Sequence, residues 1–142
     1  MKKPKLRELK EAVRSLLSRP YTSRFPFEPH DPPEGFRGKP EFQEDGCVGC
    51  AACAEVCPAL AIRYVDDRSA DPPTRRFELR YDKCIFCGQC ELHCTTAEGI
   101  RLTKTWDLAT LDRSQCVERI EHALVLCEVC GAVVGTRKHL RW

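Results

Sequence analysis

Apolar residues near the start of the chain recur at spacings of three and four positions. Over residues 4–18 this period indicates an amphipathic helix, with Pro4 in its first turn and charged residues on the opposite face. We assign residues 1–19 to this helix, which packs on its own domain or a neighbouring subunit, or lies at a membrane surface beside an integral partner. Its apolar positions are Leu6, Leu9, Ala12, Val13, Leu16 and Leu17.

The next segment, residues 20–43, is rich in proline. Proline removes backbone donors and blocks helix formation, so the segment is expected to be an extended arm. Four aromatic residues would expose a large apolar area if the arm were a free tether. The arm therefore packs on the chain's own surface or, as we prefer, clamps a partner subunit. The aromatic residues are Tyr21, Phe25, Phe27 and Phe36.

Residues 44–104 contain short strand patterns that bracket short helical ones. The charged, proline-containing stretch 66–76 between the two halves indicates a turn or surface loop. Because the halves resemble each other, we expect an α+β sandwich with pseudo-two-fold symmetry. Strands are expected near residues 42–43, 63–65, 77–80 and 101–103, and helices from about 53 to 60 and from 90 to 97.

The last segment, residues 105–142, has a different pattern. Asp112 and Gln115 are spaced as in a capping box, and apolar residues then follow at helical spacing. We therefore expect a C-terminal helix that runs to about Leu126 and is followed by a cysteine knuckle. The apolar residues are Val117, Ile120 and Leu124.

Eight of the eleven cysteines form one pattern that is written twice, with an offset of 37 residues. When two cuboidal iron–sulfur clusters share a domain, a tight loop supplies three ligands to each cluster and the fourth comes from the other run. The spacing predicts a bacterial two-[4Fe-4S] ferredoxin fold whose clusters supply much of its folding free energy. Cluster one is expected on Cys47, Cys50, Cys53 and Cys94, and cluster two on Cys57, Cys84, Cys87 and Cys90.

Two other uses of these eight cysteines fit less well. A disulfide framework needs an oxidising compartment, which nothing in the sequence indicates. Zinc sites usually pair two short cysteine spacings for each metal ion, so two complete four-cysteine runs exceed what zinc requires.

The C-terminal knuckle offers an incomplete zinc site. Cys127 and Cys130 have the spacing of zinc ligands, and His139 is a candidate third ligand. In the expected helix Cys116 would lie about 16 Å from Cys127, too far to share a metal ion, so it is expected to be a small buried hydrophobe. A knuckle without metal, or one completed by a partner subunit, is the alternative.

Composition and charge narrow the classes of function. The chain has 142 residues and a net charge of +2, too small to indicate nucleic-acid binding by itself. No stretch approaches the ~20 apolar residues of a spanning helix, and the basic N-terminus lacks the apolar core of a signal peptide. With no catalytic triad or carboxylate pair in the pattern, the chain is expected to be an intracellular electron carrier without nucleic acid as a partner.

Several motifs together resemble a known family. The chain is similar to the two-cluster ferredoxin-like subunit of membrane-bound [NiFe] hydrogenases and of respiratory complex I, above all to its formate-hydrogenlyase type. The cysteine runs are shared with many ferredoxins, and the aromatic arm and the knuckle make the likeness more specific. The matching stretches are residues 25–29, 36–41, 47–53, 84–90 and 126–130.

This resemblance implies a peripheral-arm subunit on the cytoplasmic face of the membrane. Its partners would be a small subunit that carries the cluster nearest the [NiFe] or quinone site, and other subunits of the complex. Relatives with the knuckle often continue to a second cysteine pair, whereas this chain stops at Trp142, which weakens the zinc interpretation. A free soluble ferredoxin remains an alternative, and so does a redox-sensing regulator with a zinc knuckle.

Overall fold

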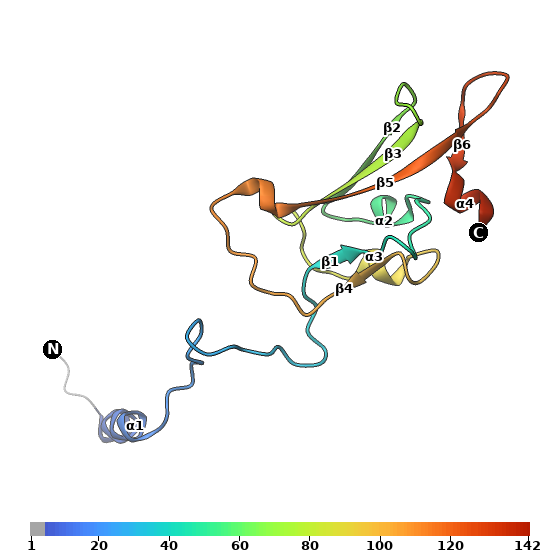
Figure 1. Cartoon of the computed structure of the whole chain (residues 1–142). Helices are drawn as coiled ribbons and strands as arrows, with labels where there is room; N and C mark the ends of the chain where they lie inside the picture. Colours follow the sequence, from blue (N-terminus) through green and yellow to red (C-terminus); the bar gives the residue numbers. More distant parts are fainter. Residues whose placement is uncertain (1–4) are drawn as a thin grey trace. The chain divides into compact units, whose positions relative to one another are not determined.

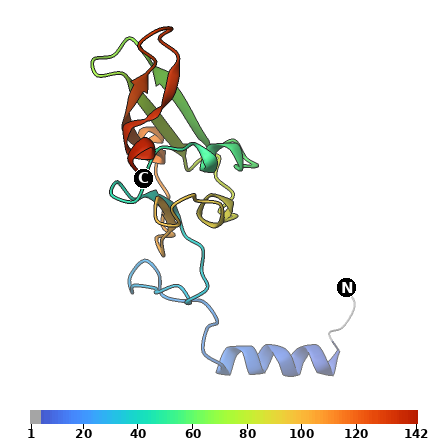
Figure 2. The same ribbon diagram turned by 90° about the vertical axis from the view of Figure 1, so that its right-hand side faces the viewer.

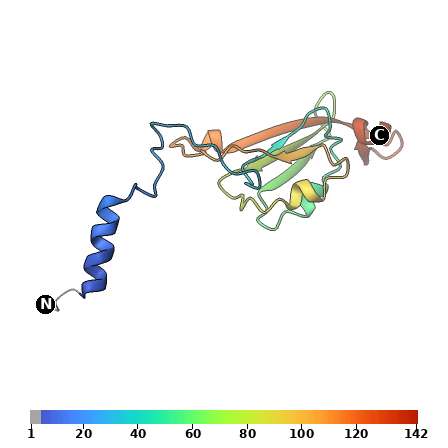
Figure 3. The ribbon, with the colours of Figure 1, turned by 90° about the horizontal axis from the view of Figure 1, so that it is seen from below.

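The computed structural model describes residues 5–142, and contacts divide the chain between Pro33 and Glu34. The first unit contains one helix, α1 (Leu6–Leu17), which Figure 3 shows as a continuous coil. The backbone N–H of Lys5 donates to the Glu8 carboxylate at 3.0 Å and so closes the first turn. No residue of α1 is buried. Pro4, expected in the first turn, lies outside the described residues.

The second unit contains two antiparallel sheets (Figure 1). One sheet pairs β1 with β4, and the other has the order β2-β3-β5-β6. The strands are β1 (Pro40–Phe42), β2 (Ile62–Asp67), β3 (Thr74–Arg80), β4 (Ile100–Leu102), β5 (Val117–Leu126) and β6 (Val133–Thr136). The short helices are α2 (Ala52–Glu55), α3 (Gln89–Leu92), the 3₁₀ turn η1 (Arg113–Cys116) and α4 (Arg137–Arg141).

The core lies between the two sheets and is centred on β3. Alternate residues of this strand point inward, so Phe77 and Leu79 are almost fully buried. The Phe77 ring packs on Phe42 of β1 and on Tyr64 of β2, with ring centroids 6.1 and 5.7 Å apart. Ile100 of β4 completes this cluster, which therefore joins the two sheets.

The repeat seen in the cysteines extends to the backbone, because α2 and α3 are related by the same offset of 37 residues. Strands occur at each of the four expected places. The two helices are shorter than expected and end at Glu55 and Leu92, because the chain turns out of each helix to present the fourth cysteine of the run.

The prediction that residues 66–76 form a turn or surface loop is partly wrong. β2 and β3 extend into it, and only residues 68–73 join them. Asp66 and Arg75 lie opposite each other in the register and form a two-pronged ion pair, at 2.6 and 2.8 Å. The charges that indicated a loop thus belong to a cross-strand pair.

The prediction of a C-terminal helix that runs to about Leu126 is also wrong. Asp112 does cap a turn, accepting the backbone N–H of Ser114 at 2.9 Å, but that turn is the four-residue η1. The chain then forms the ten-residue strand β5, which pairs with β3 through residues 117–123 and with β6 beyond them. A strand separates Cys116 from Cys127 by about 36 Å, even further than a helix would.

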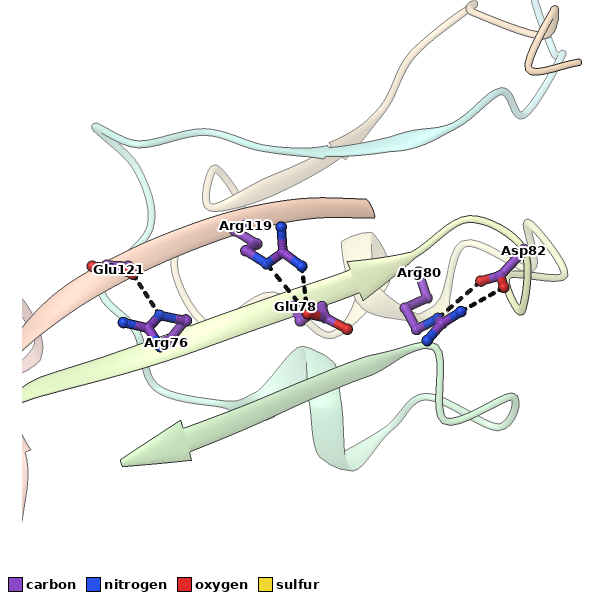
Figure 4. A network of polar contacts seen from close by, with 6 residues as sticks. All are labelled: Arg76, Glu78, Arg80, Asp82, Arg119 and Glu121. Carbon is purple, nitrogen blue, oxygen red and sulfur yellow. Dashed lines mark hydrogen bonds and ion pairs between the residues drawn. The ribbon is translucent and has the colours of Figure 1, made fainter. Parts of the chain in front are cut away.

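The outer face of the sheet explains how β5 is held. Ion pairs join residues that lie directly opposite on β3 and β5: Arg76 with Glu121 at 2.6 Å, and Glu78 with Arg119 at 3.0 Å (Figure 4). Opposite charges across an antiparallel pair favour one register. The charged residues of β5 thus form ion pairs across the sheet and do not line the exposed face of a helix.

The inner face carries Glu118, which connects β5 to the other sheet. Its carboxylate accepts the backbone N–H of Phe42 at 2.8 Å and the hydroxyl of Tyr81. Burial and this carboxylate raise the pKa of Tyr81 well above its ordinary value, so the hydroxyl stays protonated and donates. One side chain of β5 therefore fixes β1 and the start of the second cysteine loop.

We predict that Glu118→Ala destabilises the cluster-loaded chain by about 1–3 kcal/mol, because two partly buried donors lose their acceptor. The measurement is anaerobic chemical denaturation followed by circular dichroism. Glu121→Ala is the comparison on the exposed face of the same strand: it removes one exposed ion pair and should cost less, about 0.2–1 kcal/mol. Equal midpoints for the Glu118 and Glu121 variants would show that the Glu118 bridge contributes no more than an exposed ion pair.

Candidate functional site

The first cavity collects four cysteines from two separate runs. Its empty volume is about 320 Å³, and the remaining lining is mostly apolar, including Phe42, Phe77 and Ile100 from the core. The run that begins after β1 supplies three thiols, and the fourth comes from the turn that follows α3. The cysteines are Cys47, Cys50, Cys53 and Cys94.

The second cavity repeats this arrangement with the runs exchanged. Its empty volume is about 360 Å³, and Ile62, Leu79 and Leu102 are among its apolar lining. Three thiols come from the loop after β3, and the fourth comes from the turn after α2. The cysteines are Cys57, Cys84, Cys87 and Cys90. The structure therefore gathers the same two sets of four that the sequence predicts.

The backbone of both loops adopts the left-handed conformation at equivalent positions. Gly49 and Phe86 form one such pair, Ala51 and Gly88 a second, and Leu60 and Ala97 a third, each offset by 37 residues. Positive φ is costly for residues with a Cβ, so three matched pairs indicate a shape that both loops require.

Peptide N–H groups point at several of the cysteine sulfurs. The N–H of Ala61 donates to the Cys57 sulfur at 3.2 Å, and that of Gly99 donates to the Cys94 sulfur at 3.3 Å. In the second loop the N–H of Phe86 lies 3.4 Å from the sulfur of Cys84. Such donors stabilise negative charge on sulfur and raise the reduction potential of a bound cluster.

Burial makes the free thiols hard to ionise. It raises the pKa of Cys53 to about 12 and that of Cys90 to about 11, and it also raises the pKa values of Cys47 and Cys84. At Cys94 burial is opposed by hydrogen bonds from Thr96 and Gly99, which bring its pKa below the ordinary value. Thiolates gathered here need the positive charge of iron, so cluster binding releases protons.

Two threonines beside Cys94 add contacts that sequence reasoning did not identify. Thr95 stands where the first run has Pro58, and its hydroxyl lies 3.1 Å from the sulfur of Cys50. The hydroxyl of Thr96 donates to the carbonyl of Gly46 at 2.8 Å. Both contacts join the end of the second run to the first loop. The missing proline was the one signal in the sequence that marked this position.

The structure does not assemble the predicted zinc ligands. Cys127 and Cys130 lie in the turn between β5 and β6, whereas His139 lies on α4 beside the Trp142 ring. Within residues 5–142 no three His, Cys, Asp or Glu side chains converge closely enough to hold a single metal ion. The ligands of an iron–sulfur cluster bind separate iron atoms, so they need not converge on a single ion. Cys116 packs, partly buried, against the core.

Comparison with known proteins identifies the cysteine-rich region. Residues 38–99 match the 4Fe-4S dicluster domain, which confirms the prediction of iron–sulfur clusters in a mixed helix-and-strand domain. Among residues 5–142 there is no helix with the length and apolar character needed to cross a membrane.

Two curated relatives and one solved structure resemble the chain over most of its length. NAD(P)H-quinone oxidoreductase subunit I of Gloeobacter violaceus is 32% identical over 68% of this chain and 47% of that protein. Formate hydrogenlyase subunit 6 of Escherichia coli is 36% identical over 84% of this chain and 64% of that protein. A chain of the membrane-bound sulfane sulfur reductase, an archaeal respiratory membrane complex, matches with a TM-score of 0.55 and 28% identity, over 80% of this chain and 60% of that one.

The chain thus spans about half to two thirds of the length of these proteins. The likeness includes the cysteine loops, and the solved structure extends it to the fold. Residues 38–99 are therefore a 4Fe-4S dicluster domain, and the chain is a homologue of subunit I of quinone oxidoreductases and of subunit 6 of formate hydrogenlyase.

Proposed function

We propose that the chain is the electron-transfer subunit of a membrane-associated complex of the [NiFe] hydrogenase or formate-hydrogenlyase type. The observation that carries this proposal is the pair of cavities, each lined by four cysteines and an apolar wall. Such cavities suit two [4Fe-4S] clusters, which when bound supply one-electron redox chemistry. The chain's own residues hold the clusters, exclude water and point N–H groups at the sulfurs.

The lining of the cavities supports the proposed ligand assignment. Cys47, Cys50, Cys53 and Cys94 hold cluster one, and Cys57, Cys84, Cys87 and Cys90 hold cluster two. Each run thus contributes to both sites, so the two clusters share one core and lie close to each other. That proximity suits a relay in which an electron enters at one site and leaves from the other.

The first unit suits attachment to a partner subunit. All five large apolar side chains of α1 are exposed, and so are Tyr21 and Phe27 in the proline-rich arm. A row of exposed apolar groups on a helix is a typical docking surface. We propose that residues 1–33 bind a subunit that carries the next cluster, on the cytoplasmic face of the membrane. The helix residues are Leu6, Leu9, Val13, Leu16 and Leu17.

A second host is a quinone oxidoreductase of the complex I type. The likeness to subunit I of such an enzyme supports it as directly as the likeness to formate hydrogenlyase subunit 6 supports a hydrogenase. The chain would transfer electrons in either host complex, and the identity of its partner subunits distinguishes the two hosts. Zinc remains a weaker proposal, since Cys127 and Cys130 would need ligands from a partner.

We predict that the ligand sets cross between the runs. In Cys94→Ala, Cys47, Cys50 and Cys53 should become open to alkylation, because their cluster loses one ligand, while the second loop stays protected. Cys57→Ala should expose the second loop instead. The measurement is anaerobic cysteine alkylation with mass spectrometry, alongside electron paramagnetic resonance of the reduced clusters.

Cys116→Ala is the control for this experiment, since that thiol lies outside both cavities and its loss should leave both loops protected. Exposure of the loop that belongs to the mutated run would contradict the crossed assignment. Absence of iron–sulfur signals from the unmodified chain would contradict the proposed function itself.

We predict that the chain co-purifies with its complex through residues 1–33. An anaerobic pull-down in mild detergent should retain nickel as well as iron, whereas iron with flavin but no nickel would favour the complex I type. Deleting residues 1–33 should abolish co-purification and leave both clusters assembled. The truncation ends there because Gly38 and Lys39 already pair with Thr103 and Thr105 of the second unit.

A pair of double variants tests the apolar face of α1. Leu9→Gln with Leu16→Gln should prevent co-purification, because these side chains form the proposed contact. Arg7→Gln with Arg14→Gln on the charged face is the matched control and should have no effect. Loss of binding only in the arginine variants would instead support attachment to an anionic membrane surface. Normal assembly of the truncated chain would refute docking through this unit.

A further inference from the structure

We propose that Thr136, in the C-terminal strand β6, is a positioning residue that sets the reduction potential of cluster one. The inference rests on the proposed two-cluster function and assigns a role to the C-terminal segment. In Figures 1 and 2 this segment, drawn red, lies beside the loop that follows β1. Residues from this segment and from β3 bind the carbonyl groups of that loop.

The central contact joins Thr136 to a ligand sulfur through one peptide group. The Thr136 hydroxyl, fully buried, donates to the carbonyl oxygen of Val48. In a trans peptide the C=O and the following N–H point in opposite directions. The N–H of that same peptide belongs to Gly49, two residues after Cys47, and at the matched position of the second loop the N–H of Phe86 lies 3.4 Å from the sulfur of Cys84. Thr136 therefore holds the peptide whose N–H occupies the place of a donor to a cluster ligand.

Two positively charged side chains donate hydrogen bonds to other carbonyl groups of the same loop. Arg75 donates to the carbonyl of Gly49 at 3.0 Å, and the Asp66 carboxylate raises the pKa of Arg75, so the guanidinium stays charged. Lys138 of α4 donates to the carbonyl of Glu44 at 2.5 Å. The carbonyl dipoles of the loop are thus fixed from outside at three points by β3, β6 and α4.

Close packing excludes water from the hydrogen bond between Thr136 and Val48. Gly49 has φ of +70°, and a Cβ there would lie 2.8 Å from the Thr136 methyl group and 2.9 Å from the His122 ring. His122 is itself buried. The loop therefore lies directly on β5 and β6, and water cannot substitute for the threonine hydroxyl.

The second cluster loop lacks this cover. Ile85, which the repeat places equivalent to Val48, is 62% exposed, whereas Val48 is 8% exposed. A guanidinium does reach the second loop, from Arg37 to the carbonyl of Cys87 at 2.9 Å, but at an exposed site. Contact with β6 therefore distinguishes cluster one from cluster two, and a change at Thr136 should act on cluster one alone.

The test is Thr136→Val, which removes the hydroxyl and keeps the volume and burial. Without its partner the Val48 carbonyl is left buried and unsatisfied, so the peptide rotates and its Gly49 N–H is less well placed to donate to a sulfur of the cluster. Because N–H···S bonds raise cluster potentials, the midpoint potential of cluster one should fall while that of cluster two stays unchanged. Redox titration monitored by electron paramagnetic resonance measures both, with the signal missing from Cys94→Ala assigned to cluster one.

Two controls separate this role from general damage. Thr136→Ser keeps the hydroxyl, including the N-cap that accepts the His139 N–H, and should restore the potential. Thr74→Val makes the same change elsewhere on the sheet and should shift neither cluster. An unshifted cluster one in Thr136→Val, or equal shifts of both clusters, would overturn the proposal.

If Thr136→Val fails to assemble, Arg75→Lys decides the question, since it keeps the positive charge and removes the guanidinium that fixes the adjacent peptide of the same loop. A lower potential confined to cluster one would support the proposal, and no change would overturn it. Arg76→Lys, on the opposite face of the same strand, is its matched control. Failure of the unmodified chain to show two clusters would instead overturn the proposed function, and the inference with it.

Discussion

The structure depends on bringing four thiols from two distant runs into one apolar cavity, twice. Cys94 lies in the cavity of the first loop and Cys57 in that of the second, so neither half of the domain has a complete site alone. Burial raises the pKa of four of these eight thiols. The positive charge of bound iron therefore stabilises the fold as well as the redox centre, and folding is coupled to cluster assembly.

The same core residues pack the two sheets together and line the two cavities. Phe77 and Ile100 line the first cavity while they pack the two sheets together, and Leu79 does so at the second. A cluster in either site would contact the side chains that hold the sheets in register. The apolar wall lowers the potential of a cluster by excluding water, and the N–H groups raise it, so each loop balances two opposing effects.

The C-terminal segment is an integral part of this arrangement. β5 extends the sheet through cross-strand ion pairs, and Glu118 connects it to β1. β6 and α4 then cover the first loop through Thr136 and Lys138. The two loops, which share left-handed conformations at three matched positions, thus have different surroundings. An internal repeat provides two similar sites, and a segment outside the repeat makes them unequal.

The sequence by itself determined the two cysteine runs and the short strands of the repeat, because ligand spacing and alternation are local patterns. It misassigned residues 117–126, since Val117, Ile120 and Leu124 fit a helical period and the inward face of the strand includes polar residues. Only pairing with β3 makes Glu118 and His122 inward residues. Tertiary structure alone decided that Thr136 meets Val48, 88 residues away, since no local pattern records which carbonyl a distant hydroxyl will bind.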